Sequence, residues 1–326
     1  MPIVSVIVPC YNEETTIRLL LEALHLQSYP LSDLEVVIAD GMSTDGTLAQ
    51  IQGFQSDYPD LGIRVVKNEK RTIPAGLNRA IEAAQGEYIV RLDAHSMPQQ
   101  DYVAQCVADL SQGLGENVGG VWEIQPGRPG WVAKSIALAA SHPLGVGDAR
   151  YRYTDQGGFT DTVPFGSFRR TLVQEIGLYD ETLLTNEDYE FNVRIRQVGG
   201  KVWLDPKIRS VYFARPTLLA LGRQYWRYGF WKVRMLRQYP GTIRWRQLLP
   251  PVFTASLILL SLLAFWVPLA GWILAAEIGL YLAVLGFAGL HQAVKHRQFQ
   301  YLLGIPLAIM VMHLSWGSAF LWSLAS

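Results

Sequence analysis

Two side chains that can bind a metal ion follow an apolar run in the first third of the 326-residue sequence. The run, residues 87–92, is rich in residues that favour strands, and Asp93 and His95 come directly after it. Ligands of open α/β sheets bind outside the carboxyl ends of the strands, so a strand here would deliver both side chains to such a crevice. A carboxylate oxygen together with an imidazole favours Mn²⁺ over Mg²⁺. The alternative is that Asp93 caps the next helix and His95 lies in a loop.

Three repeats of a strand followed by a helix precede Asp93. The strands are predicted at residues 3–9, 34–39 and 63–67, where β-branched and other apolar residues form short runs. The helix signals after them are apolar residues at helical spacing in 17–24, capping residues in 40–47, and Pro74 in a first turn. This alternation predicts an α/β fold with a doubly wound, largely parallel sheet.

The C-terminal quarter of the sequence carries almost no charge. Glu277 is the only formally charged residue in 247–294, and residues 299–326 contain none. Apolar spans can be drawn at 250–269, 272–290 and 301–324, each near the roughly 20 residues that cross a bilayer. The connector 291–300 is basic, which predicts that it is cytoplasmic and that the C-terminus is outside. Glu277 is either a functional carboxylate or a group that reaches the interface, and His313 is interpreted as a packing residue.

A basic, aromatic segment comes before these spans. Residues 218–246 contain Gln-Tyr-Trp-Arg-Tyr at 224–228, further Trp, Lys and Arg residues, and no acidic residue. This composition is typical of a helix at the cytoplasmic, anionic face of a membrane. The N-terminus lacks the pattern of a signal peptide, and two cysteines give no disulfide framework. We therefore expect a cytosolic domain at 1–216, an amphipathic interface segment at 217–246 and a transmembrane region at 247–326.

Four segments in order carry a resemblance to a known family. They are Val8-Pro9-Cys10-Tyr11-Asn12-Glu13-Glu14, Asp40-Gly41-Met42-Ser43-Thr44-Asp45-Gly46-Thr47, Ala75-Gly76-Leu77-Asn78-Arg79-Ala80 and Arg91-Leu92-Asp93-Ala94-His95. Together they resemble the nucleotide-sugar half of the family 2 inverting glycosyltransferases, whose fold is called GT-A. The Asp-Ala-His form is most similar to the branch that builds succinoglycan-type exopolysaccharide. The resemblance implies a GT-A domain followed by an interface helix and about three transmembrane helices.

The resemblance also implies which residues hold the donor. The loop with Pro9, Tyr11 and Glu13 would bind the base and ribose together with Asp40, whose carboxylate would accept from the uracil N–H. Asp93 and His95 would hold the metal, and Arg71 would reach the nucleotide unless it is an ordinary surface arginine. The segment 163–170 would lie beneath the sugar, with Gly166 against the donor and Ser167 toward the acceptor.

Two further segments supply the catalytic roles that the resemblance implies. In Thr185-Asn186-Glu187-Asp188 the second acidic residue, Asp188, matches the family's general base, with Glu187 as its nearest competitor. The alternative is that both acids only complement the dipole of a helix. The 224–228 pentad is similar to the Gln-x-x-Arg-Trp signature of polymerising members, with Tyr228 in place of tryptophan. Gln224 and Arg227 would then bind the donor diphosphate, and Tyr228 would bind the acceptor; for Arg227 the alternative is contact with lipid.

Taken together, these residues predict a hexosyltransferase of a bacterial-type inner membrane, with its catalytic domain in the cytoplasm. It would move a hexose from a UDP-sugar to a hydroxyl of a lipid-linked saccharide in exopolysaccharide or other cell-surface polysaccharide assembly. The expected partners are the donor, the acceptor and membrane lipid, without nucleic acid, and the expected cofactor is Mn²⁺ or Mg²⁺. One alternative is a polyprenyl-phosphate sugar synthase. Another is a regulatory membrane subunit that binds a nucleotide sugar without catalysis.

Overall fold

The computed structural model describes residues 2–326, which form two compact units. The sheet unit consists of residues 2–123 and Thr154–Tyr212, and the helical unit consists of Ile124–Tyr153 and Phe213–Ser326. Residues 124–153 thus group with the long C-terminal helices, although they fall inside the first domain of the sequence-based division. That division at residue 216 stays a prediction.

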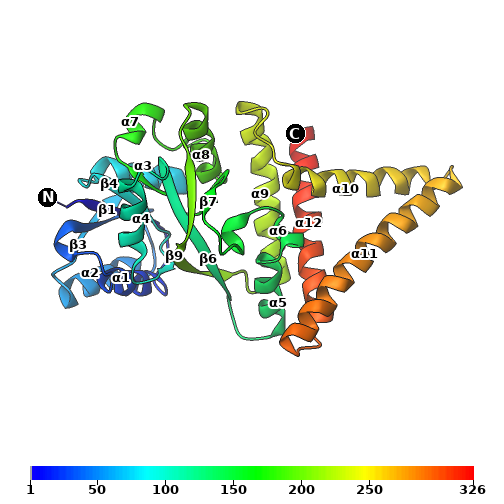
Figure 1. Cartoon of the computed structure of the whole chain (residues 1–326), viewed down its shortest axis with the longest axis horizontal. Helices are drawn as coiled ribbons and strands as arrows, with labels where there is room; N and C mark the ends of the chain where they lie inside the picture. The colour runs from blue at the N-terminus through cyan, green and yellow to red at the C-terminus, as the bar shows by residue number, and fades with distance from the viewer. Residues whose placement is uncertain (1) are drawn as a thin grey trace. The chain divides into compact units, whose positions relative to one another are not determined.

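The first half of the sheet is parallel, as the alternation of strands and helices predicts (Figure 1). Strand β1 pairs in parallel with β2 on one side and with β4 on the other, and β2 pairs in parallel with β3. The elements are β1 Val4–Cys10, α1 Ile17–His25, the 3-10 turn Leu31–Asp33, β2 Leu34–Asp40, α2 Thr47–Asp57, β3 Gly62–Lys67, α3 Ile73–Ala83 and β4 Tyr88–Arg91. The carboxyl ends of β1, β2 and β4 therefore lie at one edge of the sheet.

The sheet as a whole is mixed, because the strand pairs described after β4 are antiparallel, so the parallel order that was predicted extends only as far as β4. Strand β8 pairs antiparallel with both β4 and β6, and β9 pairs antiparallel with β5 and β7. The elements are β5 Met97–Pro98, α4 Tyr102–Ser111, β6 Asn117–Pro126, β7 Gly158–Phe159, β8 Ser167–Arg169, α7 Leu172–Ile176, α8 Glu187–Gln197 and β9 Val202–Ala214. The sheet order is β3-β2-β1-β4-β8-β6-β9-β5. The strand-and-helix repeat ends after β4, which is where the crossovers that enforce parallel pairing also end.

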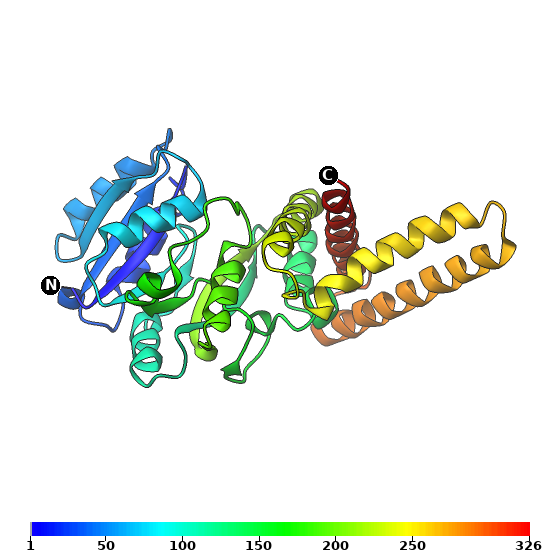
Figure 2. The same cartoon turned by 90° about the horizontal axis from the view of Figure 1, so that it is seen from above.

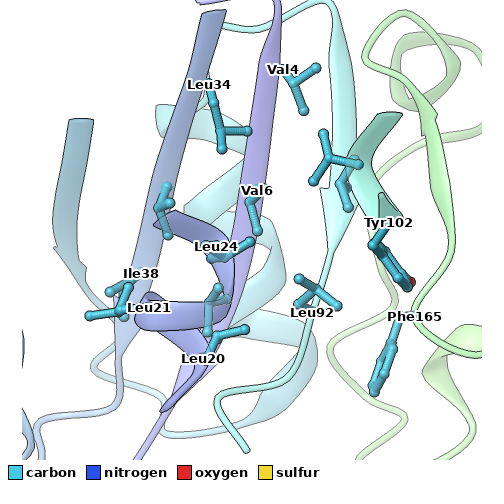
Figure 3. Close-up of a cluster of buried hydrophobic side chains, with 14 of the residues drawn as sticks. Val4, Val6, Leu20, Leu21, Leu24, Leu34, Ile38, Leu92, Tyr102 and Phe165 are labelled. Atoms are coloured by element: carbon cyan, nitrogen blue, oxygen red, sulfur yellow. The ribbon is translucent and has the colours of Figure 1, made fainter. Parts of the chain in front are cut away.

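The core of the sheet unit lies between the parallel strands and α1. Val6 of β1 and Ile38 of β2 are fully buried, and Leu20 and Leu24 of α1 pack against them (Figure 3). Strands buried on both faces read as continuous apolar runs, which is the pattern of β1 and β2. This packing fixes the strand ends from which the candidate site is built.

The helical unit holds three helices that are long and apolar enough to cross a membrane, α10 Trp245–Leu263, α11 Pro268–His296 and α12 Tyr301–Ala325. These helices mark the chain as a membrane-associated protein. The unit also contains α5 Trp131–Ala140, α6 Pro143–Val146, the 3-10 turn Arg150–Arg152 and α9 Leu218–Gln238. Figures 1 and 2 show α10 and α11 as a hairpin that leads away from α9 and α12. Helix α11 continues through most of the predicted connector 291–300.

Two polar links join the long helices. The Ser256 hydroxyl donates to the Glu277 carboxylate at 2.5 Å, so this carboxyl faces α10 rather than lying alone near a span's end. His313 hydrogen-bonds the hydroxyl of Tyr281 at 3.1 Å and the carbonyl oxygen of Leu144 at 2.8 Å. The interpretation of His313 as a hydrogen-bonded packing residue agrees with these contacts.

Candidate active site

A buried arginine links the predicted metal segment to the predicted acidic pair. Arg91, the last residue of β4, is 4% exposed, and its Nη2 donates to Glu187 Oε1 at 3.0 Å and to Asp93 Oδ1 at 3.3 Å. A buried cation needs an anionic partner, and here two carboxylates share one guanidinium. Residues 96 positions apart in the sequence are thereby brought together at the end of β4.

The acidic pair lies at the first turn of α8, where its two members differ in exposure. Asn186 has a left-handed conformation, φ 70°, directly before the helix starts at Glu187. Glu187 is buried against Arg91, while Asp188 is partly exposed and accepts from the Tyr189 backbone N–H at 2.7 Å. Burial raises the pKa of both carboxyls above the ordinary range, and the nearby Arg91 guanidinium opposes that rise. A carboxyl with a raised pKa is a better proton acceptor near neutral pH, provided it is ionised.

The loop that leads into the acidic pair is clamped by two side chains. Asn78 of α3 donates to the Tyr179 carbonyl and accepts from the Tyr179 N–H, both at 2.9 Å. Arg194 of α8 donates to the carbonyl oxygens of residues 176–178 and is paired with buried Glu190 at 2.5 Å. These bonds fix the approach of the chain to Asp188.

Asp93 and His95 supply a carboxylate and an imidazole, donor types that would suit a divalent cation such as Mn²⁺ if substrate and water completed its ligands. Asp93 has 24% of its side chain exposed and His95 has 47%. His95 Nδ1 lies 2.9 Å from Glu13 Oε1, and an ionised carboxylate can only accept, so Nδ1 carries the proton. In the neutral ring Nε2 then has the lone pair that a metal needs. Within residues 2–326 no cluster of three or more His, Cys, Asp or Glu side chains could hold a metal.

Glu13 is held in the form that this arrangement requires. Burial alone would raise its pKa, but hydrogen bonds from His95 and Thr16 outweigh burial and lower it. The Thr16 hydroxyl donates to the second carboxylate oxygen at 2.5 Å. An ionised Glu13 can therefore orient the His95 ring, a role that the sequence did not predict because the two residues are 82 positions apart.

The loops after β1 and β2 are joined into one rim. The Asn12 backbone N–H donates to Ser43 Oγ, and the Thr44 N–H donates to Asn12 Oδ1, both at 2.9 Å. Asp40 is buried at the end of β2, where its two oxygens accept from the Ser43 hydroxyl at 2.6 Å and N–H at 3.1 Å. Each carboxylate oxygen can accept a second bond, so a donor on a nucleotide base can still be bound.

Three more of the predicted donor-binding residues lie on or beside this rim. Pro9 is in β1, one residue before its end. Tyr11 is exposed, and the guanidinium of Arg71 lies 6.0 Å from the centroid of its ring. Arg71 is thus placed next to a predicted donor residue rather than elsewhere on the surface.

Gly166 and Ser167 have structural roles that the sequence did not reveal. Gly166 has a φ of 62°, and a Cβ there would meet the Asn117 side chain at 2.7 Å. The absence of a Cβ at Gly166 therefore lets the Asn117 side chain lie close to the backbone. Ser167 is fully buried in β8, where it pairs with Val90 of β4, and this burial argues against the predicted acceptor contact.

The pentad at 224–228 lies in α9 of the helical unit. Gln224 Nε2 donates to the Tyr228 hydroxyl at 2.9 Å, one helical turn away. Arg227 is exposed, and the Tyr225 ring packs edge-on against Tyr228 at 5.7 Å between centroids. The glutamine and tyrosine of the predicted signature thus support each other within one helix.

Arg91 and Asn78 lie inside the sequence motifs, but the sequence did not indicate a function for either residue. Their signal is indirect, because Arg91 is a charged residue inside a strand that is otherwise apolar. A charge at such a position needs a buried partner, and the sequence cannot identify that partner.

The chain is similar in sequence to a known protein family and to named relatives. The family model described as Glycosyl transferase family 2 matches residues 5–177. The succinoglycan biosynthesis protein ExoA of Rhizobium meliloti (strain 1021) is 30% identical over 317 residues, which cover 97% of this chain and 93% of that protein. Dolichyl N-acetyl-alpha-D-glucosaminyl phosphate 3-beta-D-2,3-diacetamido-2,3-dideoxy-beta-D-glucuronosyltransferase of Methanococcus voltae is 30% identical over 298 residues, covering 87% of this chain and 92% of that protein.

Solved structures with similar folds include two transferases. The mannosyltransferase PcManGT from Pyrobaculum calidifontis, in complex with GDP-Man and Mn²⁺, has a TM-score of 0.64 at 23% identity and covers 95% of this chain and 87% of its own. TarS 1-349 of S. aureus, in complex with UDP-GlcNAc, has a TM-score of 0.50 at 18% identity and covers 98% and 91%. At these identities the likeness concerns the fold.

Proposed function

This chain belongs to glycosyl transferase family 2 and has the GT-A fold, and we propose that it transfers a hexose from a UDP-sugar, with inversion, to a hydroxyl of a lipid-linked saccharide. The acidic pair carries this proposal. Glu187 accepts a hydrogen bond from Arg91 at 3.0 Å and is buried in this ion pair. Asp188 is partly exposed and is held in the first turn of α8. One carboxylate then holds the site together, and the other removes a proton from the acceptor.

The chemistry of an inverting transfer requires such a base. The acceptor hydroxyl attacks the sugar opposite the departing nucleotide, and a hydroxyl is too weakly acidic to be ionised beforehand. Asp188 would take this proton, while Arg91 and Glu187 hold the strand end and the helix start in register. A divalent cation bound through Asp93 and His95 would neutralise charge on the leaving diphosphate.

The donor proposal depends on Asp40 and its rim. A carboxylate at the end of β2 would accept from the imide N–H of uracil, which cytosine lacks. Guanine also has a ring N–H, and the structural neighbours hold GDP-Man in one case and UDP-GlcNAc in the other. Asp40 therefore supports a UDP-sugar without excluding a GDP-sugar, and any donor test has to include both.

The acceptor proposal comes from the relatives and from the helices. The Methanococcus voltae relative is named for a dolichyl N-acetyl-glucosaminyl phosphate, and the Rhizobium relative for succinoglycan biosynthesis. Three long apolar helices in the same chain suit an acceptor that is itself anchored in lipid. If the acceptor were a polyprenyl phosphate instead, its negative charge would make a base dispensable, and loss of Asp188 would be tolerated.

Catalysis can be separated from regulatory binding by one measurement on the purified full chain. We expect metal-dependent release of the nucleoside diphosphate from the donor when acceptor lipid is supplied. Stoichiometric binding of the donor without any release would favour the regulatory subunit and contradict an enzyme.

Metal dependence is expected to follow His95. Chelation should abolish turnover, Mn²⁺ should restore it better than Mg²⁺, and His95→Ala should remove that preference because Mg²⁺ favours oxygen ligands. Glu13→Gln should weaken Mn²⁺ binding about 10- to 100-fold through the misoriented ring, measured by titration of Mn²⁺ with nucleotide present. Glu14→Gln is the matched control, since Glu14 accepts from the Gly46 N–H instead. Unchanged Mn²⁺ stimulation in His95→Ala would show that the metal binds elsewhere.

Two variants can separate the proposed donor-binding role of Asp40 from its structural role in the loop after β2. Asp40→Asn is expected to weaken donor binding about tenfold or more, because the base N–H would lose a charged acceptor. Ser43→Ala removes the hydroxyl bond to the same carboxylate, while the backbone N–H bond and the charge of Asp40 stay in place. Equal losses of donor affinity in both variants, measured by calorimetric titration, would assign Asp40 to the loop alone.

A further inference from the structure

Helix α12 carries no Asp, Glu, Lys or Arg, but the helix beside its second half is basic. A Cβ on Gly222 of α9 would lie 3.4 Å from Val311, and a Cβ on Gly229 would lie 2.4 Å from the Trp316 carbonyl oxygen. Farther along, Arg237 donates to the Ser323 carbonyl oxygen at 2.9 Å. The residue numbers rise together, so the two helices run side by side in one direction for roughly 20 Å at 1.5 Å per residue.

The charges of α9 decide where this pair of helices can lie. The exposed or partly exposed cations of α9 are Arg223, Arg227, Arg234 and Arg237, Lys232 is buried, and the helix has no acidic residue. If α12 crossed the bilayer from its start, its second half would carry these cations through the outer leaflet. Charged side chains are costly in hydrocarbon, whereas a basic helix with an apolar face is stable among anionic headgroups.

Contacts of the first half and the middle of α12 also argue that this helix does not cross the bilayer. A Cβ on Gly304 would lie 2.1 Å from Ser135 Oγ of α5, and a Cβ on Gly145 of α6 would lie 3.0 Å from Met312. At the middle, Trp316 Nε1 donates to the Gln247 carbonyl oxygen at 3.1 Å. Gln247 follows Arg246, which forms a close ion pair with Asp148. An ion pair this near the middle of α12 would be costly in the hydrocarbon core of a bilayer.

The hairpin of α10 and α11 has the opposite pattern. Its base is basic, with Arg244 and Arg246 at the start of α10 and Lys295 and His296 in the last turn of α11. Its tip at 264–267 is uncharged, and Phe265 and Trp266 there are highly exposed. Cations at one end and aromatic rings at the other match the two interfaces of a membrane.

We propose that α9 and α12 together form a surface that lies on the cytoplasmic face of the membrane, against anionic lipid, and that only the α10–α11 hairpin crosses. The chain then crosses twice rather than three times, and Ser326 lies on the same side as the connector after α11. The proposal does not depend on the chemistry of the active site.

Cysteine labelling of the full chain in intact cells tests the proposal. Gln298→Cys marks the connector, Val267→Cys marks the hairpin tip, and Ser326→Cys marks the C-terminus; all three positions are exposed. Burial raises the pKa of both native thiols, Cys10 and Cys106, to about 12, so their labelling background is low. An impermeant maleimide should label Val267→Cys in intact cells and the other two variants only after permeabilisation.

Labelling of Ser326→Cys in intact cells together with Val267→Cys, while Gln298→Cys stays protected, would establish three crossings and overturn the proposal. Should Ser326→Cys stay unlabelled in permeabilised cells, a cysteine in a short Gly-Ser extension after Ser326 makes the same comparison. Because the result is read relative to the two markers, it holds whether or not the variants retain transferase activity.

Discussion

Asp188→Asn is expected to lower the rate of sugar transfer about 10²- to 10⁴-fold, the range that loss of a general base typically costs. Asparagine has the same shape but cannot take the proton of the attacking hydroxyl. Donor affinity should stay close to wild type, because Asp188 is assigned to the acceptor side. The measurement is steady-state transfer together with donor binding in the same preparation.

Two controls make this result specific. Asp57→Asn makes the same chemical change at a surface carboxylate that pairs with Arg18, and it should leave the rate within about twofold of wild type. Glu187→Gln should disturb stability as well as rate, since Glu187 is the buried partner of Arg91. Transfer near the wild-type rate in Asp188→Asn, or a loss confined to donor affinity, would assign the base to another acid.

The rate should also depend on pH in a defined direction. A base acts only when ionised, so the rate rises as pH rises through its pKa, and burial raises the pKa of Asp188 in the folded protein. The acid limb of kcat/KM is therefore expected above the ordinary aspartate value of about 3.9. Asp188→Asn should lose this limb, whereas a limb that persists would belong to a different group.

Arg91→Met is expected to destabilise the protein by about 3–5 kcal/mol, because it leaves the Glu187 carboxylate buried without its cation. Arg91 and Glu187 have side chains that are 5% and 8% exposed, so water cannot replace the lost partner. For a unit of this size the loss corresponds to a Tm lowered by roughly 6–20 °C, measured by thermal unfolding of the full chain in detergent.

The size of this effect can be calibrated within the same chain. Arg79→Met removes an arginine whose side chain is 49% exposed and whose partner Glu82 is also at the surface. Its cost is expected to be below about 1 kcal/mol. Arg91→Met combined with Glu187→Leu removes both charges and should recover part of the stability. A Tm for Arg91→Met that matches the Arg79→Met control would contradict the role assigned to the pair.

Most of the parallel half of the sheet could be predicted because β1, β2 and β4 are buried on both faces. The continuous apolar runs of β1 and β2 are a local signal, and the helices between them enforce parallel order. Strands such as β8, three residues long, give no comparable pattern, and their antiparallel pairing depends on partners far away in sequence. The sequence therefore does not predict where the parallel order ends.

The candidate site, too, could be predicted from the sequence only in part. Asp93, His95 and the acidic pair stand out because polar residues follow an apolar run or open a helix. The contacts that give them roles, Arg91 with Glu187 and Glu13 with His95, join residues more than 80 positions apart and leave no local trace. Similarly, the lack of charge in α12 indicates a membrane helix, but the basic neighbour α9 becomes visible only when the helices are packed.

We propose that this family 2 transferase passes a hexose from a UDP-sugar to a lipid-linked acceptor. Membranes containing the full chain can be incubated with a panel of labelled UDP-sugars and GDP-sugars, followed by extraction of the lipid fraction. We predict that label from a UDP-sugar enters the lipid fraction in a metal-dependent reaction that Asp188→Asn suppresses. Label entering lipid only from GDP-sugars would contradict the donor assignment, and release of nucleotide from every donor without labelled lipid would contradict the claim itself.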